Sequence, residues 1–239
     1  MPAYTVKSGV VNNSATAYNS GRKLARTSNG DLHCVWTDKR GDYYQIYYAK
    51  STDGGQNWVE TALTSENYYQ LYPSIAIDSN DYIHITWCGM HSGSTTYYQI
   101  RYILNNGSWQ SIENLTSGDY HQSNPSIAID SNDYIHIAWY GKHSSSTSYN
   151  QIRYILNNGS WQSIENLTSA GDHQYSPGFI WANYPIISGV KTNRTKAGYA
   201  FVWTDCTDTN SVMYYESTDL DWDTPGGALS FSSGHIIGF

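Results

Sequence analysis

Apolar and polar residues alternate over short segments of the chain, and turn-forming residues separate these segments. In DYIHITW the side chains of Ile83, Ile85 and Trp87 occupy every second position, which is the period of a β-strand with one buried face. The segments PSIAID, YQIRYIL and WQSIENL are further strand candidates, and Asn, Gly, Asp and Ser fill the connections. No segment keeps a helical period over more than two turns. The pattern predicts an all-β chain of short antiparallel strands.

This four-strand pattern occurs twice, with almost the same sequence. QIRYILNNGSWQSIENLTS spells both residues 99–117 and residues 151–169, and over residues 73–117 and 125–169 only six of 45 positions differ. The differing pairs are Thr86/Ala138, Cys88/Tyr140, Met90/Lys142, Gly93/Ser145, Thr96/Ser148 and Tyr98/Asn150. Most of them follow the tryptophan, in a segment that should be a loop because loops tolerate change. We expect the copied residues to be scaffold and the changed ones to lie near a ligand.

Worn copies of the same pattern occupy residues 24–58 and 184–222, around Trp36 and Trp203. Repeats of about 40–50 residues are typical of propellers and stacked arrays, and four short antiparallel strands form one blade of a β-propeller. We expect a single domain, residues 1–239, with blades at about residues 20–65, 72–117, 124–169 and 183–232. Residues 1–19 and 228–239 should close the ring, favoured as a reduced fifth blade. The alternatives are a four-bladed ring whose last blade they complete, and a larger six-bladed ring.

One turn carries a recognisable motif. In STDGGQNW, the residues Ser51, Asp53, Gly55 and Trp58 follow the pattern S-x-D-x-G-x-x-W, and the segment resembles the Asp-box of the sialidase-like (BNR repeat) β-propeller superfamily. The resemblance implies a structural turn between the third and fourth strands, whose tryptophan packs between neighbouring sheets, away from any catalytic face. The three-arginine clamp of that family's sialidases cannot be assembled from the six arginines of this chain. The missing clamp argues against enzymatic activity without deciding the question.

Composition excludes several classes of function. The 239 residues have a net charge of −7 and no run of Lys or Arg, which argues against nucleic acid as a partner. No apolar run approaches the ~18 residues of a membrane span, and the first residues lack the apolar centre of a signal peptide. Abundant Ser, Thr, Asn and Tyr and six N-x-S/T sequons predict an extracellular or surface-exposed glycoprotein. The three cysteines do not make a disulfide framework, and the oligomeric state stays open.

Candidate ligand-binding residues gather in two sets of loops that share one face of a propeller: those joining strand four to the next blade, and those joining strands two and three. The candidates are Tyr69, Gln70, His91, Tyr97, His121, Gln122, His143, Tyr149, His173, Gln174 and Trp181. Aromatic rings beside amides and imidazoles suit flat polar ligands such as sugars. The alternative is that these loops only pack against one another. The histidines lack the tight spacing of metal ligands, so neither a metal nor a cofactor is expected.

Three hypotheses of function follow. The first is a non-catalytic binding or adhesion module that recognises glycans or a protein partner. The second is a glycoside hydrolase, of sialidase-like type, or a lyase, with an unrecognised pair of carboxylates across a pocket. The third is a structural surface or assembly subunit. His33, His84 and His136 recur three residues before a strand-two tryptophan, and we expect them to be structural, satisfied by neighbouring backbone groups.

Overall fold

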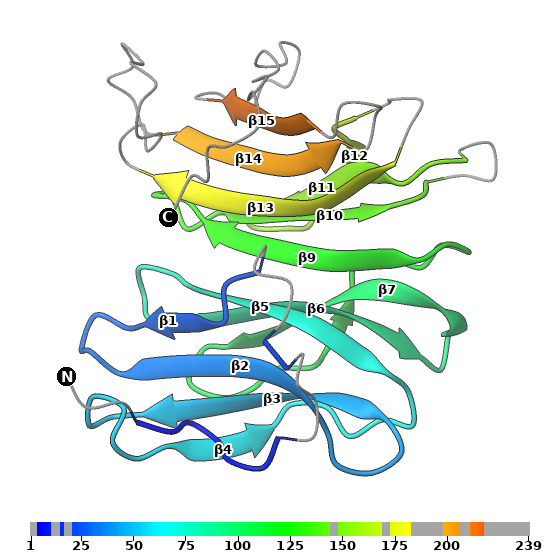
Figure 1. Ribbon diagram of the computed structural model, residues 1–239. Coiled ribbons are helices and arrows are strands. Elements are labelled where there is room, and N and C mark those ends of the chain that lie inside the picture. The colour runs from blue at the N-terminus through cyan, green and yellow to red at the C-terminus, as the bar shows by residue number, and fades with distance from the viewer. Residues whose placement is uncertain are drawn as a thin grey trace.

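Four antiparallel sheets, packed one upon the next, make up the described part of the protein (Figure 1). The computed structural model describes residues 4–10, 15–16, 21–143, 148–168, 173–182, 198–205 and 211–217. Within these residues all regular structure is strand, and none forms a helix that could cross a membrane. The predicted all-β fold of four-stranded antiparallel units is confirmed.

Each sheet takes its strands from one continuous segment, in chain order. The first sheet comprises β1 (Leu24–Arg26), β2 (Leu32–Lys39), β3 (Tyr44–Ser51) and β4 (Val59–Ala62). The second comprises β5 (Gln70–Ile77), β6 (Ile83–His91), β7 (Ser94–Asn105) and β8 (Glu113–Asn114). The third comprises β9 (Gln122–Ile129), β10 (Ile135–Gly141), β11 (Gln151–Asn157) and β12 (Glu165–Asn166). The fourth comprises β13 (Gln174–Ala182), β14 (Gly198–Asp205) and β15 (Ser211–Ser217).

The first strand of each later sheet begins earlier than the apolar pattern predicted. β5 starts at Gln70 rather than near Pro73, and the fourth sheet starts at Gln174 rather than at about residue 183. The register shifts between Leu71 and Ser74, because Pro73 has no N–H to donate to the ladder and a bulge accommodates it. Tyr72 lies in this bulge with a φ of 57°, a conformation that costs a bulky residue energy.

Buried aromatic and aliphatic side chains fill the spaces between consecutive sheets. Trp139, Ile137 and Ile127 of the third sheet pack in one cluster with Ile100 and Tyr102 of the second. The equivalent cluster between the first two sheets is centred on Trp87, Ile85 and Ile75, which are all fully buried. Burying one such aromatic side chain is worth a few kcal/mol. These apolar layers hold the sheets face to face and position the loops at their ends.

The Asp-box turn has the local geometry that its motif implies. Ser51 Oγ accepts a hydrogen bond from the Gly55 N–H at 2.9 Å, and Asp53 Oδ1 accepts one from the Asn57 N–H at 2.9 Å. Trp58 Nε1 donates to the Gly55 carbonyl at 2.9 Å. The hydrogen bonds that Asp53 accepts from the Asn57 N–H, the Asn57 side-chain amide and the Ser51 hydroxyl lower its pKa to about 2. The turn is therefore a self-contained hydrogen-bonded staple between β3 and β4.

The matching turns of the second and third sheets keep only the glycine and the tryptophan, and their tryptophans bridge neighbouring sheets. Trp109 packs edge-on against Tyr48 of the first sheet with ring centroids 5.0 Å apart, and Trp161 packs the same way against Tyr102 at 5.1 Å. Edge-to-face pairs of this kind stabilise by about 0.5–1.5 kcal/mol beyond their burial.

Hairpin turns at one end of the sheets are linked by a repeated polar contact. Asp81 Oδ1 accepts a hydrogen bond from the Ser28 N–H at 2.7 Å, and its other oxygen lies 2.5 Å from the Ser28 hydroxyl. Asp133 makes the same two contacts with Ser79, at 2.9 and 2.5 Å. The turn that joins β5 to β6 thus accepts from the first sheet through Asp81 and donates to the third through Ser79.

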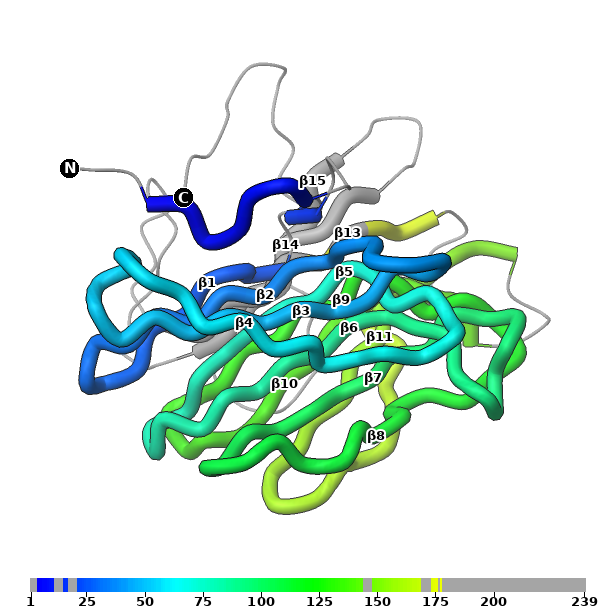
Figure 2. Tube along the Cα trace, turned by 90° about the horizontal axis from the view of Figure 1, so that it is seen from below, coloured from blue at the N-terminus to red at the C-terminus, as the bar shows by residue number. Residues whose placement is uncertain are grey.

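The described N-terminal residues lie alongside the first sheet (Figure 2). Val6, Val10 and Ala15 pack against Trp36, Tyr47 and Ala49. Residues 4–10 form no strand. Residues 228–239 lie outside the described residues, and closure of the ring by the two termini, together with the number of blades, stays a prediction.

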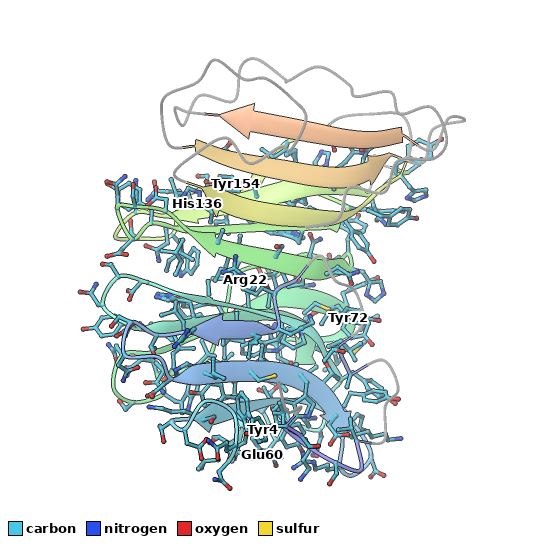
Figure 3. All side chains as sticks on the ribbon, turned by 60° about the vertical axis from the view of Figure 1, so that its left-hand side comes forward. Tyr4, Arg22, Glu60, Tyr72, His136 and Tyr154 are labelled. Atoms are coloured by element: carbon cyan, nitrogen blue, oxygen red, sulfur yellow. The ribbon has the colours of Figure 1, made fainter. Side chains whose placement is uncertain are left out.

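Each predicted structural histidine is paired with a tyrosine hydroxyl instead of the backbone. His84 Nδ1 lies 2.7 Å from the Tyr102 hydroxyl, and Figure 3 shows the equivalent pair, His136 and Tyr154, side by side in the third sheet. The Asp78 carboxylate lies 3.4 Å from His84 Nε2 and favours the ring proton on that nitrogen. His84 Nδ1 then accepts a hydrogen bond from the Tyr102 hydroxyl, whose pKa is raised by burial.

These buried histidines predict a loss of stability in mild acid. Burial lowers the pKa of His84 and of His33 below the ordinary 6.5, so below pH 6.5 the unfolded chain binds protons that the folded protein refuses. The contribution is fully present above that pH and is lost as the pH falls toward the folded pKa. We expect the free energy of unfolding, measured with urea between about pH 5 and 8, to drop on the acid side. His84→Gln should weaken the drop, and the exposed His143→Gln should leave it unchanged; equal profiles for all three proteins would contradict this account.

Candidate functional site

A pocket opens where the loops of the second and third sheets meet the start of the fourth. Its volume is about 510 Å³, within the range of ligand sites. The lining residues are Tyr97, Tyr98, Tyr120, His121, Ser123, Tyr140, Lys142, Asn150 and Tyr175. We call this the tyrosine pocket. It lies on the loop face predicted from the sequence and contains two of the predicted residues, Tyr97 and His121.

The positions at which the twin segments differ converge on this pocket. Tyr98 and Asn150 occupy one differing position and both line the pocket, while Tyr140 and Lys142 replace Cys88 and Met90 of the other copy. Three of the six differing pairs thus supply a lining residue. The two copies are otherwise nearly identical, so half of the changed positions lie at this one pocket.

A backbone hydrogen bond fixes the imidazole of His121. The Tyr98 N–H donates to His121 Nδ1 at 3.1 Å, so the neutral ring carries its proton on Nε2. Burial lowers the pKa of His121, which keeps the ring neutral near pH 7. His121 also packs against the ring of Tyr97, with centroids 5.4 Å apart. The side chain is therefore oriented to donate a hydrogen bond through Nε2.

The predicted ligand-binding glutamines have a different task. Gln70, Gln122 and Gln174 are buried in the first strands of their sheets, and their assignment to ligand binding stays a prediction. Trp139 Nε1 donates to Gln122 Oε1 at 2.6 Å, and Gln122 Nε2 donates to the Lys142 carbonyl at 2.8 Å. Gln70 makes the equivalent bonds with Trp87 and Met90. These amides tie the core tryptophan to the loop that follows it.

A second series of glutamines was missed from the sequence. Gln99 Nε2 donates to the Gly118 carbonyl at 2.7 Å, and Gln99 Oε1 accepts from the Thr116 hydroxyl at 2.7 Å. Gln45 holds the preceding loop in the same way, through the carbonyl of Glu66. The signal was present, because a glutamine stands immediately before the apolar part of β3, β7 and β11. Gln45 and Gln99 each fix the start of the loop that runs to the next sheet.

The remaining predicted residues are spread beyond the tyrosine pocket. Tyr69 packs against Tyr43 and Tyr44, with ring centroids 5.3 and 5.9 Å apart, as expected if these loops pack against one another. Tyr149 and His173 form an edge-on pair at 5.3 Å, next to the pocket residues Asn150 and Tyr175 in the chain. His143 is exposed. The side chain of Trp181 lies outside the described part of the chain.

His91 belongs to a second hollow, of about 400 Å³, which also contains Glu66 and Arg101. Here Arg101 donates from both terminal nitrogens to the two carboxylate oxygens of Glu66, at 2.5 and 2.9 Å. Burial, together with the charge of Arg101, lowers the pKa of His91. The carboxylate of Glu66 is thus engaged by an arginine, as is that of Asp38, whose Oδ2 accepts from Arg40 at 2.8 Å.

Two features limit the chemistry available at the tyrosine pocket. None of its nine lining residues is acidic, so it does not itself contain the carboxylate pair that glycoside hydrolysis requires. Over the described residues, no three His, Cys, Asp or Glu side chains are grouped so that they could hold a metal ion. The pocket offers tyrosine hydroxyls, one oriented imidazole, one ammonium group and one amide.

Comparison with known proteins identifies the fold but not a family. No family model matches the chain, and no curated protein matches it. An α-L-arabinanase of Penicillium chrysogenum, solved with arabinobiose, superposes with a TM-score of 0.64 and 16% identity over 89% of this chain and 67% of that one. A GH93 α-L-arabinofuranosidase of Fusarium graminearum, also solved with arabinobiose, gives 0.60 and 14% over 83% and 62%. An ulvan lyase of polysaccharide lyase family PL25 gives 0.59 and 13% over 82% and 52%.

These comparisons correct the first hypothesis of function. The named structures that share the fold are enzymes that process glycans, which contradicts the reading of the chain as a non-catalytic binding or adhesion module and favours the hydrolase or lyase hypothesis. The chain spans between about half and two-thirds of the length of these neighbours. What the likeness establishes is the architecture, a β-propeller of the kind found in glycoside hydrolases and polysaccharide lyases.

Proposed function

We propose that the protein is a glycan-cleaving enzyme whose substrate binds in the tyrosine pocket. The observation that carries the proposal is the convergence of the changed positions of a near-perfect duplication on one pocket of about 510 Å³. The glycan-processing enzymes that share the fold support it. Faces of tyrosine rings suit the apolar faces of sugars, while His121 Nε2, Asn150 and Lys142 can bond to hydroxyl groups.

The absence of acidic residues from the pocket lining favours a lyase over a hydrolase. Elimination needs a base that removes a proton next to a carboxyl group and an acid that protonates the leaving oxygen, and tyrosine, histidine and lysine can serve. Hydrolysis needs two carboxylates, which residues outside this lining would have to supply. It remains the second candidate because two of the named structures of this fold are arabinan-degrading enzymes.

Three finer assignments belong to the same proposal. The Ser51–Trp58 turn supports placement in the sialidase-like superfamily, since its hydrogen bonds follow the Asp-box motif. The sequons and the uncharged polar surface support export and glycosylation. A glycan is the partner that the pocket fits best.

Incubation with a panel of neutral and uronic-acid polysaccharides tests the proposal. A lyase releases fragments with an unsaturated end that absorbs ultraviolet light, whereas a hydrolase releases saturated reducing ends. We expect His121→Ala and Tyr140→Ala to lower the rate of cleavage by about 100-fold, because both side chains line the pocket. Tyr82→Ala, at an exposed turn, is the control and should cleave normally. Cleavage that neither pocket variant reduces would refute the site, and no cleavage across the panel would refute the function.

A further inference from the structure

Arg101 of β7 and Arg153 of β11 are twins, 52 positions apart, with almost the same surroundings. Each donates from Nε to an asparagine and from Nη1 to a glutamine and to a backbone carbonyl. The partners of Arg101 are Asn114 at 3.0 Å, Gln70 at 3.1 Å and the Met90 carbonyl at 3.5 Å. The partners of Arg153 are Asn166 at 3.1 Å, Gln122 at 3.0 Å and the Lys142 carbonyl at 3.4 Å. Each guanidinium also lies against a core tryptophan, at 5.7 and 5.8 Å from the ring centroid. Both are held in place by the same frame.

The two arginines differ in one partner. Glu66 takes the two outward N–H groups of Arg101, and the residue 52 positions later is Gly118. Within the described residues Arg153 has no carboxylate partner and its Nη2 makes no hydrogen bond. Arg101 is 3% exposed, whereas Arg153 is half-buried and open to solvent. The position that the Glu66 carboxylate occupies against Arg101 is thus accessible to solvent at Arg153.

The charges around this place also favour an anion. Around Arg101 the residues Glu66, Asn67 and Met90 have a summed formal charge of −1. Their counterparts around Arg153, which are Gly118, Asp119 and Lys142, sum to 0, so the surroundings of Arg153 are one charge unit more positive. Asp119 is exposed and forms no ion pair with the described residues. His143, which is exposed, stands at the position of His91 in the aligned copies. The chain as a whole has a net charge of −7, so this cationic place stands apart from its background.

We infer that Arg153 binds the carboxylate of a uronic-acid sugar, seated where Glu66 sits on Arg101. The planar guanidinium fork matches two carboxylate oxygens, and the twin pair displays that match within the same chain. The Lys142 carbonyl contacts Arg153, and Lys142 also lines the tyrosine pocket, so a sugar held at Arg153 extends toward that pocket. The inference rests on the proposed function and names its substrate class, an anionic polysaccharide that carries uronic acids.

Binding measurements with Gly118 variants test the inference separately from catalysis. Calorimetry would use four probes of similar length: glucuronate, galacturonate, sulfated neutral and unmodified neutral oligosaccharides. A Cβ added at Gly118 meets no atom within 4 Å, so Gly118→Glu should place a carboxylate on Arg153 without disturbing the fold. We expect it to weaken binding of at least one uronate probe tenfold or more. Gly118→Gln, of equal size and uncharged, should retain most of the affinity, and Arg153→Met should lose it.

Each outcome decides a separate point. Uronate affinity that is equal in the wild type, Gly118→Glu and Arg153→Met overturns the inference. If only the sulfated probe binds and responds to Gly118→Glu, the anion site stands but the assignment to a carboxylate is overturned. Cleavage of neutral glycans by a protein that binds no uronate leaves the proposed function intact and removes the inference. Uronate binding that responds to Gly118→Glu, without cleavage of any polysaccharide, supports the anion site at Arg153 and refutes the proposed enzymatic function.

Discussion

Replacing Trp139 with alanine is expected to lower the free energy of unfolding by about 3–5 kcal/mol. The side chain is fully buried and lies at the centre of the cluster that joins the second and third sheets. Its loss removes the packing of a large ring and leaves a cavity between two sheets that cannot collapse independently. It also removes the N–H that Gln122 Oε1 accepts, which loosens the loop that carries Lys142. Urea denaturation followed by tryptophan fluorescence or circular dichroism measures the loss.

Trp139→Phe separates the two contributions. It keeps most of the ring packing but deletes the indole N–H, so we expect a smaller loss of about 1–2 kcal/mol. Gln122 Oε1 would still accept a hydrogen bond from Arg153, which limits the cost. If Trp139→Ala and Trp139→Phe destabilise equally, packing is not the main term and this account of the core fails.

Replacing Glu66 with alanine is expected to destabilise the protein by about 3 kcal/mol. Glu66 neutralises Arg101, which is 3% exposed, and its removal takes away both the opposite charge and two charge-assisted hydrogen bonds. The twin Arg153 is stable without a carboxylate because it is half-buried and water reaches it. Chemical denaturation at low and high salt measures the effect, which should shrink only in part at high salt because Arg101 is buried while the Glu66 side chain is partly exposed.

Two matched variants complete that experiment. Glu66→Gln preserves an oxygen acceptor for Arg101 and should cost less than Glu66→Ala, because the guanidinium keeps a hydrogen bond. Gly118→Ala, at the equivalent place of the third sheet, meets no neighbouring atom and should change stability by less than about 0.5 kcal/mol. A loss at Glu66→Ala no larger than that at Gly118→Ala would show that the ion pair contributes nothing.

Most of the fold could be predicted from the sequence, because alternation and repetition are local signals. The strand around Ile85 and the repeat around Trp87 and Trp139 both correspond to observed strands. The polar starts of the first strands were not foreseen. Gln70 and Gln122 resemble loop residues in the sequence, and only contacts with a tryptophan 17 positions away explain their burial. Tertiary partners of this kind leave no periodic trace.

The candidate site was predicted in part. Its face, together with Tyr97 and His121, followed from the position of the aromatic loops, while Tyr140 and Lys142 were noticed only as differences between copies. The prediction of a non-catalytic module failed for a separate reason. It rested on the missing arginine clamp of one enzyme family, and a propeller scaffold supports several other chemistries.

Because of the serine–aspartate contacts between the hairpin turns, consecutive sheets meet in a head-to-tail interface. The second sheet presents Asp81 to the sheet before it and Ser79 to the sheet after it. A surface of this type is complementary to a copy of itself and has no built-in last member. A gene that duplicated one blade in tandem would therefore produce a new blade that already fitted both neighbours. Adding a blade therefore requires no new interface. The loops of the added blade can then change while the sequence of its strands stays almost identical.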